Sequence, residues 1–278
     1  MKKLLGIIKR HKVESVGLVG AFLVVILGIF GPWFAPYSPT EVHWGDKYSP
    51  PSTKHFFGTD RVGRDIFSRV LAGARISLIG AGWVLLAALL IGGTIGISAG
   101  LIGGVFDNII MRLADIFLSF PPLILAIAIS ASLGAGLNAA IISLAITWWP
   151  GYSRVFRSQV LSTKNEVYVE AAEAVGASRW RIIFKHIVLN SIDPIIVNAT
   201  LNVGRIILSL ASLGFIGVGA QPPSPEWGAM VAAGRDQLMS NWWVFFLPGI
   251  SIFITVLSFT LCGDILRSEM DPELWQKK

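Results

Sequence analysis

The chain has 278 residues, of which 53% are hydrophobic and only 14% are charged. Soluble domains usually carry about 25% charged residues, so this composition excludes an ordinary soluble protein and indicates a chain that crosses a membrane several times. The formal net charge of +6 does not indicate nucleic-acid binding, because basic residues gather on the cytoplasmic loops of membrane proteins.

The first long apolar run covers residues 16–34 and follows a basic N-terminal cluster. The run is too long for the core of a cleaved signal peptide and lacks a small-residue cleavage pattern, so we predict a retained first span. The single cysteine, Cys262, lies in the last apolar run, so no disulfide can form within the chain. The basic cluster consists of Lys2, Lys3, Lys9, Arg10 and Lys12.

Six apolar runs approach the ~20 residues that an α-helix needs to cross the hydrocarbon of a bilayer. We therefore predict an all-α polytopic membrane protein with six transmembrane helices. Residues 1–75 would hold the first span and an external loop, and residues 76–278 would hold the other five spans. The runs lie at 16–34, 76–102, 112–134, 137–153, 192–218 and 243–264.

The distribution of lysine and arginine predicts that both termini are cytoplasmic. With the N-terminus inside, four internal segments hold 15 of the 23 basic residues, seven lie on the other side, and Arg205 lies within a span. This bias follows the positive-inside rule. The internal segments are 1–12, 103–116, 154–190 and 265–278.

The internal segment 160–190 has an amphipathic pattern. Its acidic residues come first and its basic residues last, an order that suits the dipole of a helix. An apolar face is predicted from the i, i+3, i+4, i+7 spacing of its large side chains. The residues of this face are Trp180, Ile183, Phe184 and Ile187.

Small residues precede that face. Glu170 is followed by Ala171 and Ala172, which leave little side-chain bulk and would let a partner's surface approach the backbone. Gly176 permits a turn between two short helices. Spacing alone leaves two interpretations open: a loop that docks on a partner protein, and a helix that lies in the membrane interface.

Two polar stripes run along the last two apolar runs. Asn198, Asn202, Arg205 and Ser209 step by four, three and four residues, and Ser212 continues the stripe. The second stripe consists of Ser251, Thr255, Ser258 and Cys262. Hydrogen bonds between helices explain most of these serines and threonines.

Arg205 needs a separate explanation, because an arginine in the middle of a membrane costs at least ~2.5–3.5 kcal/mol and should face protein or water. Two roles remain open for it, lining a translocation path and pairing with a carboxylate of a partner subunit. A path would also use Asn198, Asn202 and Ser209.

The remaining polar residues suggest ordinary roles. Arg112 and Asp115 are three residues apart, and we expect a local ion pair between them. His43 and His55 lie in the external loop without the spacing of metal ligands, and we expect ordinary loop histidines. No glycine is followed directly by lysine, so a phosphate-binding P-loop is absent, and no HExxH motif occurs. The chain is therefore predicted to be non-catalytic, with no metal or cofactor bound to it.

Several motifs resemble those of one transporter family. Residues 170–187, Glu-Ala-Ala with Gly176 and then Ile187, resemble the coupling motif of ABC importer permeases. Three further segments resemble the dipeptide, oligopeptide and nickel branch of that family. They are 57–69 (FGTDRVGRDIFSR), 217–230 (GVGAQPPSPEWGAM) and 263–267 (GDILR).

The resemblance implies a C-type permease subunit of a type I ABC importer in a bacterial or archaeal cytoplasmic membrane. Its partners would be membrane lipid, a homologous second permease, two ATP-binding subunits that use ATP and Mg²⁺, and an extracytoplasmic solute-binding protein. The loop with Glu170, Ala171, Ala172, Gly176 and the apolar face would dock on the ATPase. A secondary transporter, which needs no ATPase, leaves this loop unexplained.

The cargo suggested by the resemblance is nickel or a metal chelate, with di- or oligopeptides as the alternative. Peptide-type relatives often carry a glutamate where Leu210 stands, whereas nickel-type relatives tend to lack it and to have a basic residue at the position of Arg205. Many relatives also have a proline at the position of Leu189, so the end of the loop departs from their pattern.

Overall fold

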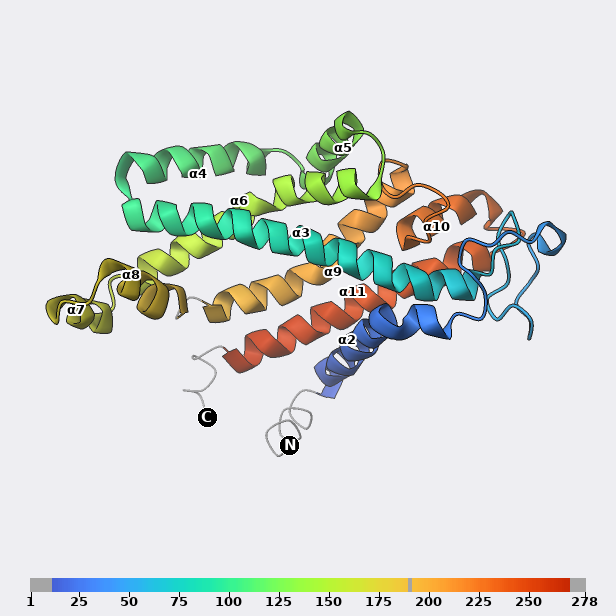
Figure 1. Ribbon diagram of the computed structural model, residues 1–278, viewed down its shortest axis with the longest axis horizontal. Helices are drawn as coiled ribbons and strands as arrows, with labels where there is room; N and C mark the ends of the chain where they lie inside the picture. The colour runs from blue at the N-terminus through green and yellow to red at the C-terminus, as the bar shows by residue number, and fades with distance from the viewer. Residues whose placement is uncertain (1–11, 190–191, 271–278) are drawn as a thin grey trace.

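The computed structural model describes residues 12–189 and 192–270. The basic residues 2–10 and the last eight residues of the chain lie outside the described part. Helices dominate the described residues, where an isolated bridge between Thr59 and Asp65 is the one β-type pairing. Long helices run side by side along the longest axis, with residues 167–188 at one end and the 35–65 loop at the other (Figure 1).

The first predicted span is confirmed. It consists of α2 (Lys12–Phe30) and a 3-10 turn, η1 (Gly31–Phe34). α2 packs against the last helix, α11 (Trp243–Met270), and small residues bring the two close together. Gly20 lies directly against Ser258, where any larger side chain would collide with the serine hydroxyl.

The second span begins earlier than predicted. α3 runs from Ile66 to Ile102 and has 37 residues, so it starts ten residues before position 76. Asp65 caps its first turn by accepting a hydrogen bond of 2.7 Å from the Ser68 amide. At 1.5 Å per residue the helix is about 55 Å long, which exceeds the ~30 Å hydrocarbon layer. The helix therefore extends beyond the hydrocarbon layer.

The predicted span over 112–134 is not one continuous helix. The structure has two helices there, α4 (Gly104–Ser119) and α5 (Pro122–Leu133), which are bent by 90° at their junction. Pro121 and Pro122 have no amide hydrogen to donate, and a residue before proline is pushed into an extended conformation, as Phe120 is. The pair is a broken span or a re-entrant hairpin.

The last two long helices follow the prediction closely, whereas the predicted fourth run forms a helix that is not among those apolar enough to cross a membrane. α6 (Leu137–Thr163) is ten residues longer than the predicted fourth run, and α9 (Ile192–Ile216) and α11 match the fifth and sixth. A short helix after α9, α10 (Trp227–Gly234), was not predicted. Among the described residues four helices are long and apolar enough to cross a membrane, or five with the bent pair. The all-α class is confirmed, whereas the count of six is not.

The main core lies where α3, α6 and α9 meet. Val84 on α3, Leu144 on α6, and Ile206 and Leu210 on α9 are all buried there. Gly92 on α3 lies close enough to α6 that an added Cβ would come within 2.7 Å of the Trp149 carbonyl oxygen. Small residues at such contacts let membrane helices approach closely, and this packing fixes the direction in which α6 delivers the chain to the internal loop.

Candidate functional site

The loop between α6 and α9 folds into a helical hairpin. α7 (Val167–Ala174) is followed by a turn at Gly176, then by α8 (Arg179–Arg181) and a π-helical segment, η3 (Ile182–Val188). Gly176 has φ +79°, a left-handed conformation that favours glycine. The predicted turn between two short helices is confirmed. In Figure 1 the hairpin projects beyond the ends of α3 and α6.

The inner face of the hairpin is held by a small apolar core. Val169, Ile182 and Ile187 are buried together with Val160 of α6, and Ile97 of α3 packs against them. Lys164 adds a hydrogen bond of 3.1 Å from its Nζ to the Gly100 carbonyl near the end of α3. The hairpin is therefore tied to both long helices, so a force on it is transmitted to them.

The outer face carries a stacked aromatic pair. Trp180 is 72% exposed and Phe184 58% exposed, and their rings lie parallel within 14° at a centroid distance of 5.7 Å. The prediction that Ile187 shares this face is wrong, because Ile187 is only 3% exposed. A π-helix bonds residues five apart, so Ile182 and Ile187 fall on the same inward side.

The small residues of the hairpin lie on both of its sides. Glu170 and Ala171 are exposed, whereas Ala172 and Ile183 are half-buried and Ala172 contacts the inner core. The Glu170 carboxylate, Ala171 and the aromatic pair are thus all accessible to a partner. We refer to Glu170, Ala171, Trp180 and Phe184 as the hairpin surface.

The polar stripe of α9 makes one contact to another helix. The Asn202 side-chain amide donates to the Tyr152 hydroxyl of α6 at 3.1 Å, whereas Asn198 and Ser209 donate to carbonyls four residues earlier in α9. Arg205 is exposed. The predicted stripe is therefore only partly covered by this chain's own helices.

The stripe of α11 differs from the prediction. Ser251 and Thr255 donate to the carbonyls of Leu247 and Ser251, at 2.9 and 2.8 Å, within their own helix. The expectation that they bond between helices is wrong. Because these hydroxyls donate to carbonyls of the preceding turn, α11 and α2 are held together here by van der Waals packing.

Ion pairs join α4 to α6. Asp115 binds Arg154 rather than its neighbour Arg112, so the predicted local pair is wrong. Arg157 binds Asp107 in the same way, with Nε and Nη2 each donating a 2.5 Å hydrogen bond to the carboxylate. The partners are 39 and 50 residues apart, which explains why local spacing could not reveal them.

The segments 57–69 and 217–230 pack into one platform at the opposite end of the molecule. Arg69 Nη1 donates to the carbonyls of Pro39 and Pro223, at 2.7 and 3.2 Å. The Trp227 indole donates to the Val70 carbonyl at 3.0 Å. The sequence marked both segments by resemblance but did not show that they touch, because their contacts span more than 150 residues.

His55 lies inside this platform and not on a loop surface. It is 2% exposed, and its Nδ1 lies 2.9 Å from Asp65 Oδ1. His55 lies in the loop as predicted, but its burial was not foreseen. Its nearest partner is the carboxylate that caps α3, so the histidine helps to fix the start of that helix.

Glu226 caps α10 from a buried position. Its two carboxylate oxygens each accept a hydrogen bond of 2.9 Å, from the amides of Gly228 and Ala229. Burial raises the pKa of the Glu226 carboxyl, and the two amide bonds oppose that rise.

The long apolar helices and the bent pair α4 and α5 define the class of protein, a multi-pass membrane protein. The chain belongs to the family described as the binding-protein-dependent transport system inner membrane component, whose model matches residues 92–276. The N-terminal TM domain of oligopeptide transport permease C matches residues 5–51.

Curated relatives cover almost the whole chain. The probable D,D-dipeptide transport system permease protein DdpC of Escherichia coli is 44% identical, over 99% of this chain and 93% of the relative. The dipeptide transport system permease protein DppC of Alkalihalophilus pseudofirmus is 43% identical, over 96% and 88%. The glutathione transport system permease protein GsiD of Pectobacterium atrosepticum is 38% identical, over 96% and 89%.

A solved structure shows the same fold. The inward-facing MetNI methionine ABC transporter matches with a TM-score of 0.53 and 20% identity, over 72% of this chain and 95% of that one. The fold is thus that of a type I ABC importer permease. The chain is a non-catalytic permease of an inner membrane, and ATP hydrolysis and solute capture belong to separate subunits.

Proposed function

We propose that this chain is a permease subunit of an importer for di- or oligopeptides. The support comes from the relatives, whose names specify D,D-dipeptides, dipeptides and glutathione. These cargoes share a peptide or peptide-like backbone with charged ends. Nickel, the cargo preferred from the sequence, finds no support in these names.

The packing also removes one argument for nickel. That argument relied on Leu210, which is 2% exposed and lies in the main core against Gly80 of α3. A side chain in that position cannot contact a solute. Arg205, the other residue behind the nickel hypothesis, is exposed and would attract a carboxylate as readily as a chelate.

Within the importer, the hairpin surface is proposed to dock on an ATP-binding subunit. The exposed Trp180–Phe184 stack carries this assignment, because exposed aromatic pairs are strong anchors in protein interfaces. When ATP and Mg²⁺ close the ATPase pair, the docked hairpin would move. Through Val160 and Lys164 it would shift α6 and α3 between inward- and outward-facing states. Such a lever works only by contacting the two ATPase states differently.

The complete importer would contain a homologous second permease, two ATP-binding subunits and an extracytoplasmic solute-binding protein. Both termini would be cytoplasmic, so that the hairpin faces the ATPases and the platform of residues 57–69 and 217–230 faces the binding protein. Residues 1–75 would form the N-terminal span, its external loop and the first turns of α3, and 76–278 the transport domain. Arg205, Asn198, Asn202 and Ser209 would line the path together with the second permease.

The cargo is tested by uptake into liposomes that hold the complete importer, with ATP inside and the solute-binding protein outside. Labelled D-alanyl-D-alanine, L-alanyl-L-alanine and glutathione are compared with labelled nickel, with and without a histidine chelator. We expect ATP-dependent uptake of at least one of the peptides and no uptake of nickel. Uptake of nickel alone would overturn the peptide assignment.

The docking role is tested with the double variant Trp180→Ala/Phe184→Ala. Loss of both rings should lower uptake at least about tenfold and release the ATPase from the purified complex, because interface anchors of this kind are each worth about 2 kcal/mol or more. The control is Trp242→Ala, an exposed aromatic at the other end of the molecule. Full uptake by the double variant, with the complex intact, would contradict a docking role.

A further inference from the structure

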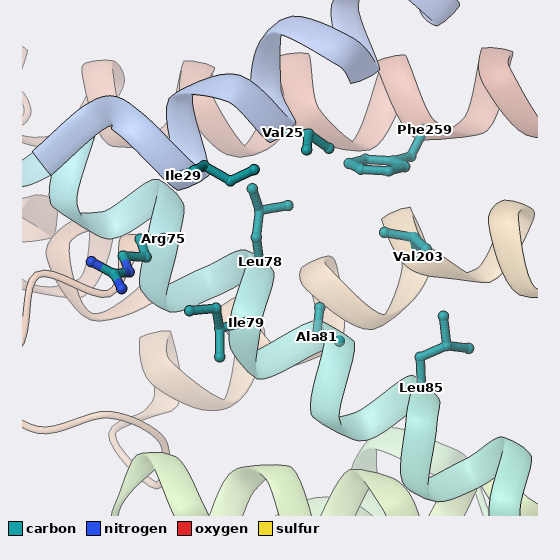
Figure 2. Close-up of a pocket in the computed structure, with 11 residues that line it drawn as sticks. Val25, Ile29, Arg75, Leu78, Ile79, Ala81, Leu85, Val203 and Phe259 are labelled. Atoms are coloured by element: carbon teal, nitrogen blue, oxygen red, sulfur yellow. The ribbon is translucent and has the colours of Figure 1, made fainter.

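An apolar groove lies between α2 and α3, far from the hairpin. It has a volume of about 390 Å³ and is floored by α9 and α11 through Val203 and Phe259. Figure 2 shows aliphatic side chains and the Phe259 ring around this space, with Arg75 at the end nearer the start of α3. Of the side chains that line the groove, only Arg75 is charged.

The depth of Arg75 follows from how α2 meets α3. Gly31 packs against Leu71, where an added Cβ would lie 3.0 Å from the Leu71 carbonyl oxygen. Gly28, about one turn earlier in α2, packs against Leu78, about two turns later in α3. Arg75 therefore lies level with the last turn of α2. The residues that follow this turn, Trp33 and Phe34, are exposed.

Exposed aromatic residues at the end of a span mark the boundary between lipid and water. Arg75 is thus about one turn inside that boundary, where phospholipid phosphates are within reach of a long side chain. Its guanidinium is exposed and can bind a phosphate through two parallel hydrogen bonds. From Arg75 the groove continues along α3 toward the membrane centre as far as Leu85.

We propose that this groove is a binding site for a phospholipid, with one acyl chain lying between α2 and α3 and the phosphate on Arg75. The lipid belongs to the leaflet on the side of residues 31–65. The proposal needs only that the chain crosses a membrane and does not depend on the cargo.

The size of the groove favours an acyl chain over a helix of a partner subunit. From position 75 to 85, ten residues, α3 rises about 15 Å. A helix of that length and ~10 Å in diameter fills roughly 1,200 Å³, which exceeds the total empty space of about 860 Å³ in the groove. The rim residues Ile29 and Ile79 are apolar and exposed, as expected for a surface that meets lipid.

One position allows the groove to be filled without disturbing the packing. Gly82 lines it, and an added Cβ there would have no atom within 4 Å. Gly82→Phe therefore occupies the space of the acyl chain, and Arg75→Gln removes the phosphate partner while keeping the side-chain length. Gly249 on α11 is equally open and does not line the groove, so Gly249→Phe is the matched control.

The test is native mass spectrometry of the complete importer, delipidated in detergent and then titrated with phosphatidylglycerol. Wild type and Gly249→Phe should retain one tightly bound lipid for each copy of this chain. Gly82→Phe and Arg75→Gln should each bind it at least about tenfold more weakly. Gly82→Phe prevents burial of the acyl chain, and Arg75→Gln removes the charge-assisted hydrogen bonds to the phosphate. Diacylglycerol, which lacks the phosphate, should bind wild type weakly. Its affinity for Arg75→Gln should equal its affinity for wild type.

Two results would overturn the proposal. Equal lipid binding by wild type, Gly82→Phe and Arg75→Gln would show that the tight lipid sits elsewhere. Loss of the second permease from the Gly82→Phe complex, with lipid binding unchanged, would identify the groove as a subunit contact. Correct assembly of each variant is checked by the subunit masses in the same spectra.

Discussion

The guanidinium of Arg157 on α6 binds the carboxylate of Asp107 on α4 through two hydrogen bonds of 2.5 Å, donated by Nε and Nη2. The Asp107 side chain is 10% exposed and that of Arg157 32%. Asp107 lies in the first turn of α4, just after α3 has ended, and Arg157 lies about two turns before the end of α6. This pair therefore fixes the place where three helices meet next to the hairpin.

Replacing Arg157 by glutamine should destabilise the chain, because it leaves the Asp107 carboxylate buried without its cation. A hydrogen bond to a charged group contributes about 1.5–3 kcal/mol, and the partial exposure of Arg157 places the loss in the lower half of this range. Chemical unfolding in mixed micelles measures it.

The control for this experiment is Arg154→Gln. Arg154 and Asp115 form the neighbouring pair, but their side chains are 51% and 55% exposed, and exposed pairs contribute about 0–1 kcal/mol. The double variant Arg157→Gln/Asp107→Asn should recover part of the lost stability, since no charge stays buried. Equal losses for Arg157→Gln and Arg154→Gln would show that burial of the first pair does not matter.

Gly228 should not tolerate alanine. It opens α10 directly against α9, where an added Cβ would lie 2.5 Å from Ala211 Cα and would touch the Ala211 carbonyl oxygen as well. Backbone atoms cannot rotate away, so α10 must shift, at a cost of about 1–3 kcal/mol. Limited proteolysis should then cut the 217–226 connection faster than in wild type. Gly249→Ala, at an open position, should leave the cleavage rate unchanged.

Glu226 should make stability depend on pH. Burial raises its pKa in the folded protein above the value of about 4.3 for an unfolded glutamate. As pH rises from 4.3 through the folded pKa, the unfolded chain loses its proton first, so the free energy of unfolding falls across this window and is level above it. Below pH 4.3 the favourable contribution of Glu226 is fully present.

The variant Glu226→Gln carries no titrating proton, so its unfolding free energy should vary less over that window. Its side-chain oxygen can still accept a hydrogen bond from the first turn of α10. The comparison requires unfolding curves at several pH values between about 4 and 7. Glu166→Gln, at an exposed position of the hairpin loop, is the matched control for the change of charge. If the free energy of unfolding varies with pH equally in Glu226→Gln and wild type, Glu226 is not the source of the pH dependence.

The sequence predicted those elements whose cause is local. The apolar runs at 16–34, 192–218 and 243–264 became helices because a bilayer requires about 20 apolar residues in a row. The turn at Gly176 was predictable because only glycine adopts its φ of +79° without strain. The break in the 112–134 run was also predictable from the sequence, because Pro121 and Pro122 interrupt a helix whatever the length of the apolar run.

Other features depend on residues far apart in the chain. α3 starts ten residues early because its polar side chains there find partners: the Ser68 hydroxyl accepts a hydrogen bond from the Tyr37 amide, and Arg69 donates to the carbonyls of Pro39 and Pro223. Asp65 caps this start through the Ser68 amide. Hydropathy alone excludes such residues from a span. The inward turn of Ile187 follows from a π-helical register over 182–188, which a 3.6-residue period cannot anticipate.

Gly176 should determine how well the hairpin transmits movement. Its left-handed φ costs an L-residue of ordinary type about 1–2 kcal/mol, and asparagine less. An added Cβ has no atom within 4 Å, so Gly176→Ala changes the backbone energy without a steric clash. We expect Gly176→Ala to reduce ATP-driven uptake several-fold while the complex stays assembled, and Gly176→Asn to retain most of it. Ala174→Gly, in the same hairpin, shows whether added flexibility alone has this effect. Equal uptake by wild type and Gly176→Ala would mean that the hairpin's docked shape does not require this turn, and that the aromatic surface alone carries the coupling.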